Sequence, residues 1–156
     1  MDHIKWMEKA LQIAHENVLS GHGGPFGAVI VKDGHIVATG CNEVTTNHDP
    51  TAHAEVQAIR AACKQLNHFQ LTDCDLYTSC EPCPMCIGAI YWSRPRAVYY
   101  ACTKEEAAAI GFDDHFIYQQ LAIPMNQRSI QMVQIDTSGR SLAFDAWRVS
   151  QQRISY

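Results

Sequence analysis

The chain has 156 residues, most simply one domain (1–156), and a domain of this size buries enough surface to fold without disulfides. Hydrophobic residues make up 47% and charged residues 18%, which is the composition of an ordinary soluble globular protein. The net charge of −4 argues against a nucleic-acid binder, because phosphate contacts require clustered Lys and Arg, and it suits a small uncharged substrate.

The N-terminal residues 1–18 carry acidic side chains early and lack an unbroken apolar core, so they do not resemble a signal peptide. No apolar run reaches the length of a membrane span. We therefore expect a cytoplasmic protein that meets no membrane. In that reducing compartment, the seven cysteines are expected to bind metal or do chemistry rather than form a disulfide framework.

The first half of the chain predicts a helix at residues 2–20 and a second helix at about residues 50–66. Between them it predicts a hairpin of two strands, residues 26–32 and 35–39, followed by a loop at residues 41–50. Asp33-Gly34 lies between the two strands and is a strong hairpin signal. Asp49-Pro50 is expected to begin the second helix, with Asp as the cap and Pro in the first turn.

The second half predicts strands at residues 75–79 and 97–101 and a weak strand at residues 129–135. Helices are predicted at residues 84–93, 104–110, 113–121 and 141–154. Strands that alternate with helices imply an α/β protein with a mostly parallel sheet, and the opening hairpin adds one antiparallel pair. We therefore predict a three-layer α/β/α sandwich with a five-stranded mixed sheet.

Two of the predicted helix starts carry side chains that bind metals. His53 lies at one start, and Cys83 and Cys86 lie at the other. In an open α/β sheet, helix starts beside strand ends gather on one side, and unpaired N–H groups there favour the thiolate that binds zinc. Three protein ligands would leave the fourth position of a tetrahedral zinc ion open for water, as in a catalytic site.

Glu55 is expected to stand beside the metal without binding it and to move the proton of the activated water. Residues two apart on a regular helix point roughly 200° apart, so His53 and Glu55 cannot both face a metal at the side of the helix. The hypothesis therefore requires that the metal lie beyond the helix end. The Glu55 side chain would then have to extend further than the His53 side chain to approach it.

A closed structural site is the alternative, because Cys80, Cys83, Cys86 and His53 could supply four protein ligands. The protein would then be a zinc-stabilised interaction module, in which a carboxylate at position 55 has no use. Of the eight histidines only His53 has a metal context, and four cysteines without partner spacing are expected to be small buried side chains: Cys41, Cys63, Cys74 and Cys102.

Other side chains keep two interpretations at this point. Phe26 is either a platform for a ring or part of the core. Asp113-Asp114 is either a helix cap or a second acid near the site, and Trp92 is either core or a wall of the substrate pocket.

The pair His53-Ala54-Glu55 and Pro82-Cys83-Pro84-Met85-Cys86 matches the H-x-E…P-C-x-x-C signature of the zinc nucleobase deaminases. The stretches GGPFGAVIVKDG, DPTAHAEV, TSCEPCPMCIGAIYW and GFDD resemble the short bacterial guanine deaminases of the cytidine-deaminase-like type. This resemblance covers essentially the whole chain. It implies the α/β/α sandwich, one zinc ion per chain, and hydrolysis of guanine to xanthine and ammonia.

The resemblance also implies a role for each site residue. His53, Cys83 and Cys86 would hold zinc, Glu55 would shuttle protons, and Asp114 would be a second proton carrier. The substrate-binding residues would be Asn42, Phe26, Ala54, Trp92 and Tyr156. The resemblance further implies a homodimer whose C-terminal segments exchange between subunits, so that Tyr156 would serve the neighbour's site.

Two enzyme rivals share this signature. A tRNA adenosine deaminase would need a basic surface around the pocket, whereas this chain is acidic and residues 146–156 hold only two arginines. A cytosine deaminase would need a smaller pocket. A nucleobase is therefore the expected substrate, and a nucleic acid is not an expected partner.

Overall fold

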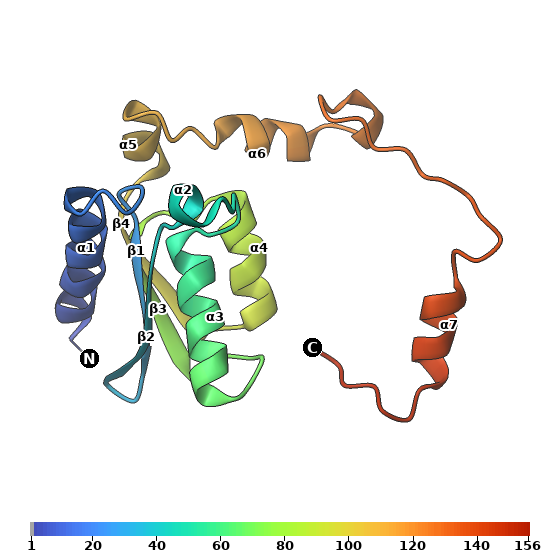
Figure 1. Ribbon diagram of the computed structural model, residues 1–156, viewed down its shortest axis with the longest axis horizontal. Helices are drawn as coiled ribbons and strands as arrows, with labels where there is room; N and C mark the ends of the chain where they lie inside the picture. The colour runs from blue at the N-terminus through green and yellow to red at the C-terminus, as the bar shows by residue number, and fades with distance from the viewer. Residues whose placement is uncertain (1) are drawn as a thin grey trace. The chain divides into compact units, whose positions relative to one another are not determined.

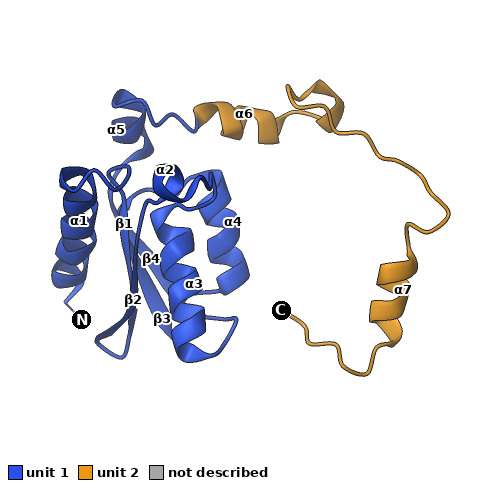
Figure 2. Cartoon of the chain, in the orientation of Figure 1, with its two compact units in different colours: residues 1–114 blue, residues 115–156 orange. Residues whose placement is uncertain are grey.

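The computed structural model describes residues 2–156, which group by their contacts into two compact units (Figure 2). The first unit ends at Asp114 and contains α1 (His3–Leu19), β1 (Gly27–Lys32), β2 (His35–Cys41), α2 (Val44–Asn47), α3 (Ala54–Leu66), β3 (Cys74–Cys80), α4 (Pro84–Ser93), β4 (Ala97–Cys102) and α5 (Lys104–Ala109). The second unit runs to Tyr156 and contains α6 (His115–Ala122), the 3-10 turn η1 (Met125–Gln127) and α7 (Leu142–Val149). Among residues 2–156, no helix combines the length and the apolar composition that a bilayer span requires.

The first unit is built on a mixed sheet of four strands in the order β2-β1-β3-β4. β1 runs antiparallel to both of its neighbours, so that Val29 lies opposite Thr39 on β2 and Tyr77 on β3. β3 and β4 run parallel and are joined through α4, the kind of crossover connection that a parallel pair requires. α1 covers one face of the sheet, and α3 and α4 cover the other (Figure 1). The predicted α/β fold with a mixed sheet is confirmed, but the prediction of a mostly parallel sheet with one antiparallel pair is wrong. The pair β1–β3 is antiparallel as well as the hairpin pair β1–β2, and only β3–β4 is parallel.

The predicted fifth strand, residues 129–135, is wrong within this chain. These residues are irregular, and no described strand bonds to them. Their apolar side chains, such as Ile130 and Ile135, are exposed at 73% and 77%. A strand is stabilised by hydrogen bonds to a neighbour and by a buried face, and both are missing here. The spacing of apolar residues was therefore insufficient to predict this element.

The two central strands bury both of their faces. Along β1, Ala28 and Ile30 point to the core under α3, while Val29 and Val31 point to the core under α1. This alternation is the two-residue period of a strand, and the unbroken apolar run follows from having a helix on each side. β3, the strand that precedes the cysteine motif, is buried along its whole length from Cys74 to Cys80. The end of β3 is therefore a rigid platform.

The start of α3 differs from its prediction in a way that matters for the site. The helix begins at Ala54, and Asp49 does not cap it. Instead, Asp49 Oδ1 accepts hydrogen bonds from the backbone N and the hydroxyl of Thr51, at 2.8 and 2.7 Å. An Asp side chain competes for such local turns as readily as it caps helices. The predicted loop 41–50 also contains α2, and the last helix stops at Val149 rather than at residue 154.

α3 packs on β2 with backbone against backbone. A Cβ added at Gly40 would overlap the carbonyl oxygen of Ala54 and approach the amide nitrogen of Ala58. Both alanines are completely buried. The lack of a side chain at Gly40 therefore sets the distance between the sheet and the first turn of α3.

We predict that Gly40→Ala lowers the free energy of unfolding by about 1–3 kcal/mol, because the rigid backbone of α3 must move to admit the methyl group. Gly88→Ala is the matched control. It lies within α4, where an added Cβ meets nothing within 4 Å, so helix propensity should make it neutral or slightly stabilising. Urea titration of both variants measures the difference, and equal midpoints would contradict the packing argument.

Candidate active site

The imidazole and two thiols predicted to hold a metal come together in the first unit. His53 is the N-cap of α3, Cys83 is the N-cap of α4, and Cys86 lies one turn into α4. The Nδ1 atom of His53 lies 3.4 Å from the sulfur of Cys83 and 3.5 Å from that of Cys86. All three ligand atoms lie within 4.8 Å of one another. Two helix starts far apart in sequence thus meet at the end of β3.

The donor set fits zinc. With Zn–S near 2.3 Å and Zn–N near 2.05 Å, tetrahedral angles place a nitrogen and a sulfur ligand about 3.6 Å apart. The two nitrogen–sulfur distances, 3.4 and 3.5 Å, are close to that value. One imidazole and two thiols are also the ligand types that zinc prefers.

The pKa values of the two thiols are shifted in opposite directions. The pKa of Cys83 is lowered, first because its sulfur accepts a hydrogen bond from Cys86 and also because His53 bonds to it. The pKa of Cys86 is raised because it donates to Cys83 and is buried. Hydrogen bonding to Cys83 likewise raises the pKa of His53. A cation between these groups would displace a thiol proton, since metal binding releases protons from its ligands.

The closed four-ligand alternative does not fit the position of Cys80. This cysteine ends β3, but its sulfur points to the carbonyl oxygen of Thr103 at 3.7 Å, outside the group of three ligands. Burial raises the pKa of Cys80 to about 12, so its thiol stays protonated. The described residues therefore offer three ligands, not four.

Glu55 is buried beside the ligands, with 6% of its surface exposed. Thr78 donates a hydrogen bond to its Oε1 at 3.0 Å, and the Cys86 thiol points to its Oε2 at 3.4 Å. Burial is the main cause that raises the pKa of this carboxyl group. A carboxyl group that gains a proton easily next to a metal site is suited to proton transfer.

The geometric condition on His53 and Glu55 is met by the helix start. His53 has an extended backbone (φ −72°, ψ 155°) and precedes the helix, so its side chain does not lie on the helical wheel. Glu55 is in the first turn. The two side chains can therefore approach the same point off the helix end, because the roughly 200° rule holds only within a regular helix.

Asn42 is a buried residue in the connection from β2 to α2. Its Oδ1 accepts hydrogen bonds from the backbone N–H groups of Gly24 at 3.4 Å and Val44 at 3.3 Å, and its backbone oxygen accepts one from Asn17 at 2.9 Å. These contacts orient the carboxamide with its NH₂ group as the remaining donor. The sequence analysis missed Asn17, and Thr78 as the partner of Glu55, because nothing in their local sequence marks them.

Phe26 and Asp114 lie in the same unit. The ring of Phe26 meets the ring of Phe112 edge to face, with 4.9 Å between centroids and 88° between planes. Phe112, which the sequence analysis did not single out, thus joins Phe26 to the segment that holds Asp114. Asp114 is half-buried whereas Asp113 is exposed. Burial, followed by the charge of Cys83, raises the pKa of Asp114.

The remaining three residues predicted to bind the substrate lie in three different places. Ala54 is completely buried at the first position of α3, next to His53. Trp92 is 64% exposed, six residues beyond Cys86 and so about 9 Å further along α4. Tyr156 belongs to the second unit and is 67% exposed. The structure does not bring Trp92 to the ligands within this unit, and its role stays a prediction.

The four cysteines outside the motif vary in burial. Cys74 is buried as predicted, Cys41 and Cys63 are half-buried, and Cys102 is exposed. The prediction for Cys102 is wrong because it lies at the exposed end of β4. All seven cysteines of the chain are free thiols.

Comparison with known proteins connects this geometry to a family. The family model described as the cytidine and deoxycytidylate deaminase zinc-binding region matches residues 1–102. A guanine deaminase of Bacillus subtilis is 57% identical over 148 residues, which are 95% of each chain. The X-ray structure of guanine deaminase from Bacillus subtilis superposes with a TM-score of 0.98 at 54% identity and covers 100% of this chain and 99% of that one.

More distant relatives match a smaller share of the chain. A tRNA-specific adenosine deaminase of Agrobacterium fabrum is 40% identical over 95 residues, 61% of this chain and 62% of its own. The ligand cluster lies inside the stretch that the family model covers. The chain therefore belongs to the cytidine and deoxycytidylate deaminase zinc-binding family.

Proposed function

We propose that this protein is a zinc-dependent guanine deaminase that hydrolyses guanine to xanthine and ammonia. The observation that carries the reaction type is Glu55, a buried carboxyl group within hydrogen-bond reach of the Cys86 thiol and oriented by Thr78. A purely structural zinc site has no use for such a group. The choice of guanine rests on the 57% identity to the Bacillus subtilis enzyme over 95% of both chains.

In this proposal His53, Cys83 and Cys86 hold one zinc ion per chain, on the basis of their donor types and distances. Zinc bound by three protein ligands lowers the pKa of a coordinated water to about 7 and so supplies the nucleophile at neutral pH. Both cysteines would bind such an ion as thiolates, so its binding would release the thiol protons.

Glu55 moves the protons. It takes one from the attacking water and delivers it to the ring nitrogen beside the carbon that carries the exocyclic amine. The water oxygen forms a bond to that carbon. Glu55 then takes the second proton from the resulting hydroxyl and gives it to the amine, and the carbon–nitrogen bond breaks as the carbonyl forms, which releases ammonia. Burial raises the pKa of Glu55, which suits a group that must hold a proton between these steps. Asp114, half-buried with a raised pKa, is the proposed second proton carrier.

The base would be recognised by polar and aromatic contacts. The Asn42 carboxamide, held by Gly24 and Val44, is proposed to donate its NH₂ to the purine, while Phe26 offers a ring and Ala54 lies at the helix start. A buried donor left unpaired by the wrong base lowers its binding, which is a source of selectivity. Trp92 and Tyr156 are proposed to close the pocket.

We further propose a homodimer in which the C-terminal segment 115–156 packs on the other subunit, so that each subunit completes one domain. No residue of this segment is buried. Large apolar side chains such as Phe144, Trp147 and Ile154 are exposed at 76%, 48% and 64%. A soluble monomer rarely leaves that much apolar surface in water, so a second copy of the chain is the expected partner for this surface.

The free thiols support a cytoplasmic location.

We predict that ammonia release will be fastest with guanine in a panel that also contains adenine, cytosine, their nucleosides and tRNA. The tRNA-specific adenosine deaminase of Agrobacterium fabrum is 40% identical over 61% of the chain, and the net charge is −4, so salt-sensitive tRNA binding is not expected. Preferential release from tRNA or from cytosine would overturn the assignment of the base. Activity toward none of them would favour the interaction module.

Glu55→Gln should lower kcat by about 100- to 10,000-fold, because the amide cannot carry the proton, while zinc content and the urea midpoint stay near those of the wild type. Glu8→Gln, an isosteric change on the exposed face of α1, is the matched control and should keep full activity. Metal analysis and steady-state kinetics provide the readouts. Substantial activity in Glu55→Gln would refute the proton-transfer role.

Sedimentation should report a dimer, and exchange of segments should allow complementation. If Tyr156 serves the other subunit, Tyr156→Ala and Glu55→Gln are each impaired, but a mixture refolded together gains activity. With random pairing, about a quarter of the sites would combine both intact residues. A monomer, or no gain of activity on mixing two impaired variants, would contradict the exchange.

A further inference from the structure

We propose that the protein has a second metal site, formed by His22 Nε2, Cys41 Sγ and the Glu43 carboxylate, which takes a zinc-like divalent cation. The three ligand atoms lie within 4.8 Å of one another, like those of the first cluster. His22 follows α1, Cys41 ends β2, and Glu43 is the N-cap of α2. The proposal is independent of the proposed reaction, because none of these residues is assigned to it.

The distances suit a four-coordinate cation after a small adjustment. His22 Nε2 lies 3.2 Å from Glu43 Oε1. A tetrahedral zinc ion places a nitrogen and an oxygen ligand about 3.4 Å apart and a sulfur ligand about 3.6 Å from each of them. The Cys41 sulfur lies no more than 4.8 Å from either of the other two ligand atoms. It therefore has to move at most about 1.2 Å closer to each of them to reach the tetrahedral distance. The side chains of His22 and Glu43 are 37% and 27% exposed, so the cation has an entry path from solvent.

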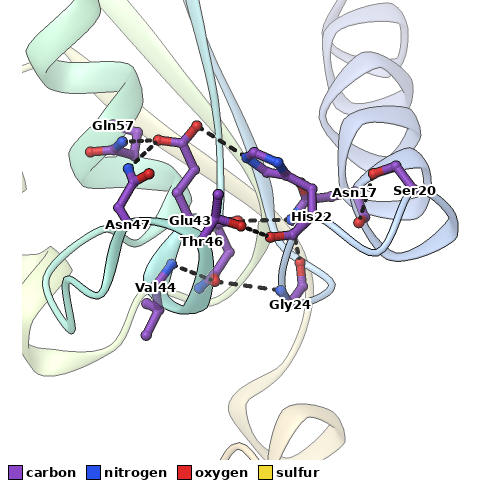
Figure 3. A network of polar contacts seen from close by, with 10 residues as sticks. Asn17, Ser20, His22, Gly24, Glu43, Val44, Thr46, Asn47 and Gln57 are labelled. Atoms are coloured by element: carbon purple, nitrogen blue, oxygen red, sulfur yellow. Dashed lines mark hydrogen bonds and ion pairs between the residues drawn. The ribbon is translucent and has the colours of Figure 1, made fainter.

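The carboxylate is held in position from its other side. Figure 3 shows Glu43 between His22 and the side chains of Asn47 and Gln57. Asn47 and Gln57 donate to Oε2, Asn47 at 3.2 Å, whereas Oε1 faces the imidazole. Hydrogen bonds to the atoms behind a ligand fix its orientation and are a usual part of built metal sites. Glu43 is therefore oriented for a ligand on the His22 side.

The main chain that carries His22 is also fixed. The hydroxyl of Thr46 donates to the His22 carbonyl oxygen, and the His22 N–H donates to Asn17 at 3.1 Å. A simple ion pair between His22 and Glu43 would account for the 3.2 Å between the imidazole nitrogen and the carboxylate oxygen. It would not explain a free, half-buried thiol within reach of both. The third donor is what points to a metal.

The donor types select the class of cation. One nitrogen, one sulfur and one carboxylate oxygen suit zinc, cobalt or nickel, whereas magnesium and calcium prefer oxygen alone. The carboxylate and a thiolate would together balance the two positive charges. Water would complete the coordination, since this group offers three protein ligands.

A cation at this site would stabilise the segment that carries Asn42. Asn42 lies between Cys41 and Glu43, and its Oδ1 and backbone oxygen already bond to Gly24 and Asn17 near His22. Gln57, which contacts Glu43, lies on α3 two residues after Glu55. The site would thus join the loop after α1, the end of β2 and the start of α3.

The test titrates Co²⁺ into protein that already holds one equivalent of zinc, using equilibrium dialysis and absorbance. We expect a second equivalent to bind, with a thiolate-to-cobalt charge-transfer band, while Mg²⁺ fails to compete. Cys41→Ser should remove the band of this second equivalent, and His22→Ala should weaken its binding at least about 10-fold. Both variants should keep their zinc at the first site, since neither residue touches it.

Matched controls use residues of the same type outside the group. Cys63→Ser changes another half-buried thiol, and His35→Ala changes the exposed histidine that begins β2; both variants should bind the second equivalent like the wild type. Equal urea midpoints before Co²⁺ is added establish that the four variants are folded. A single equivalent in the wild type overturns the proposal, as does a second equivalent whose band and affinity survive both Cys41→Ser and His22→Ala.

Discussion

The start of α3 and the start of α4 meet at the end of the buried strand β3, and the chemistry of the site depends on this junction. Each helix presents its N-cap, His53 or Cys83, where backbone N–H groups have no partner within the helix. Such an end favours the thiolate form of cysteine and the negative charge of the site. The two sulfurs and the imidazole lie close enough to bind one cation, and the pKa of Cys83 is lowered there.

Backbone packing, rather than side-chain contact, fixes this junction in space. Gly40 lets β2 approach the first turn of α3, and β3 is fixed by α1 on one face and α3 on the other. Glu81 extends the platform beyond β3, since its N–H donates to Cys102 at 2.8 Å and its carboxylate accepts from Lys104 at 3.1 Å. The cysteine turn is therefore anchored directly before the ligands. Precision of this kind is what a catalytic constellation requires.

The two clusters of metal-binding side chains are connected through α3. Gln57 contacts Glu43 in one cluster, and its N–H donates to the carbonyl oxygen of His53 in the other, at 2.9 Å. The N–H of Glu43 donates to Ala52, the residue before His53, also at 2.9 Å. Order in the segment around Asn42 is therefore coupled to order at the helix start. The second unit contrasts with this rigidity, because its exposed apolar side chains have no core of their own.

The sequence by itself determined the α/β pattern, the hairpin at Asp33-Gly34 and the pairing of His53-Ala54-Glu55 with the cysteine motif, because these depend on local periodicity, turn chemistry and ligand spacing. It misjudged residues 129–135, since a strand exists only where a neighbour can bond to it. It did not find Thr78 or the group His22, Cys41 and Glu43. These side chains come together only when the ends of α1, β2 and β3 are brought to one side of the sheet, a contact between distant segments that no local pattern encodes.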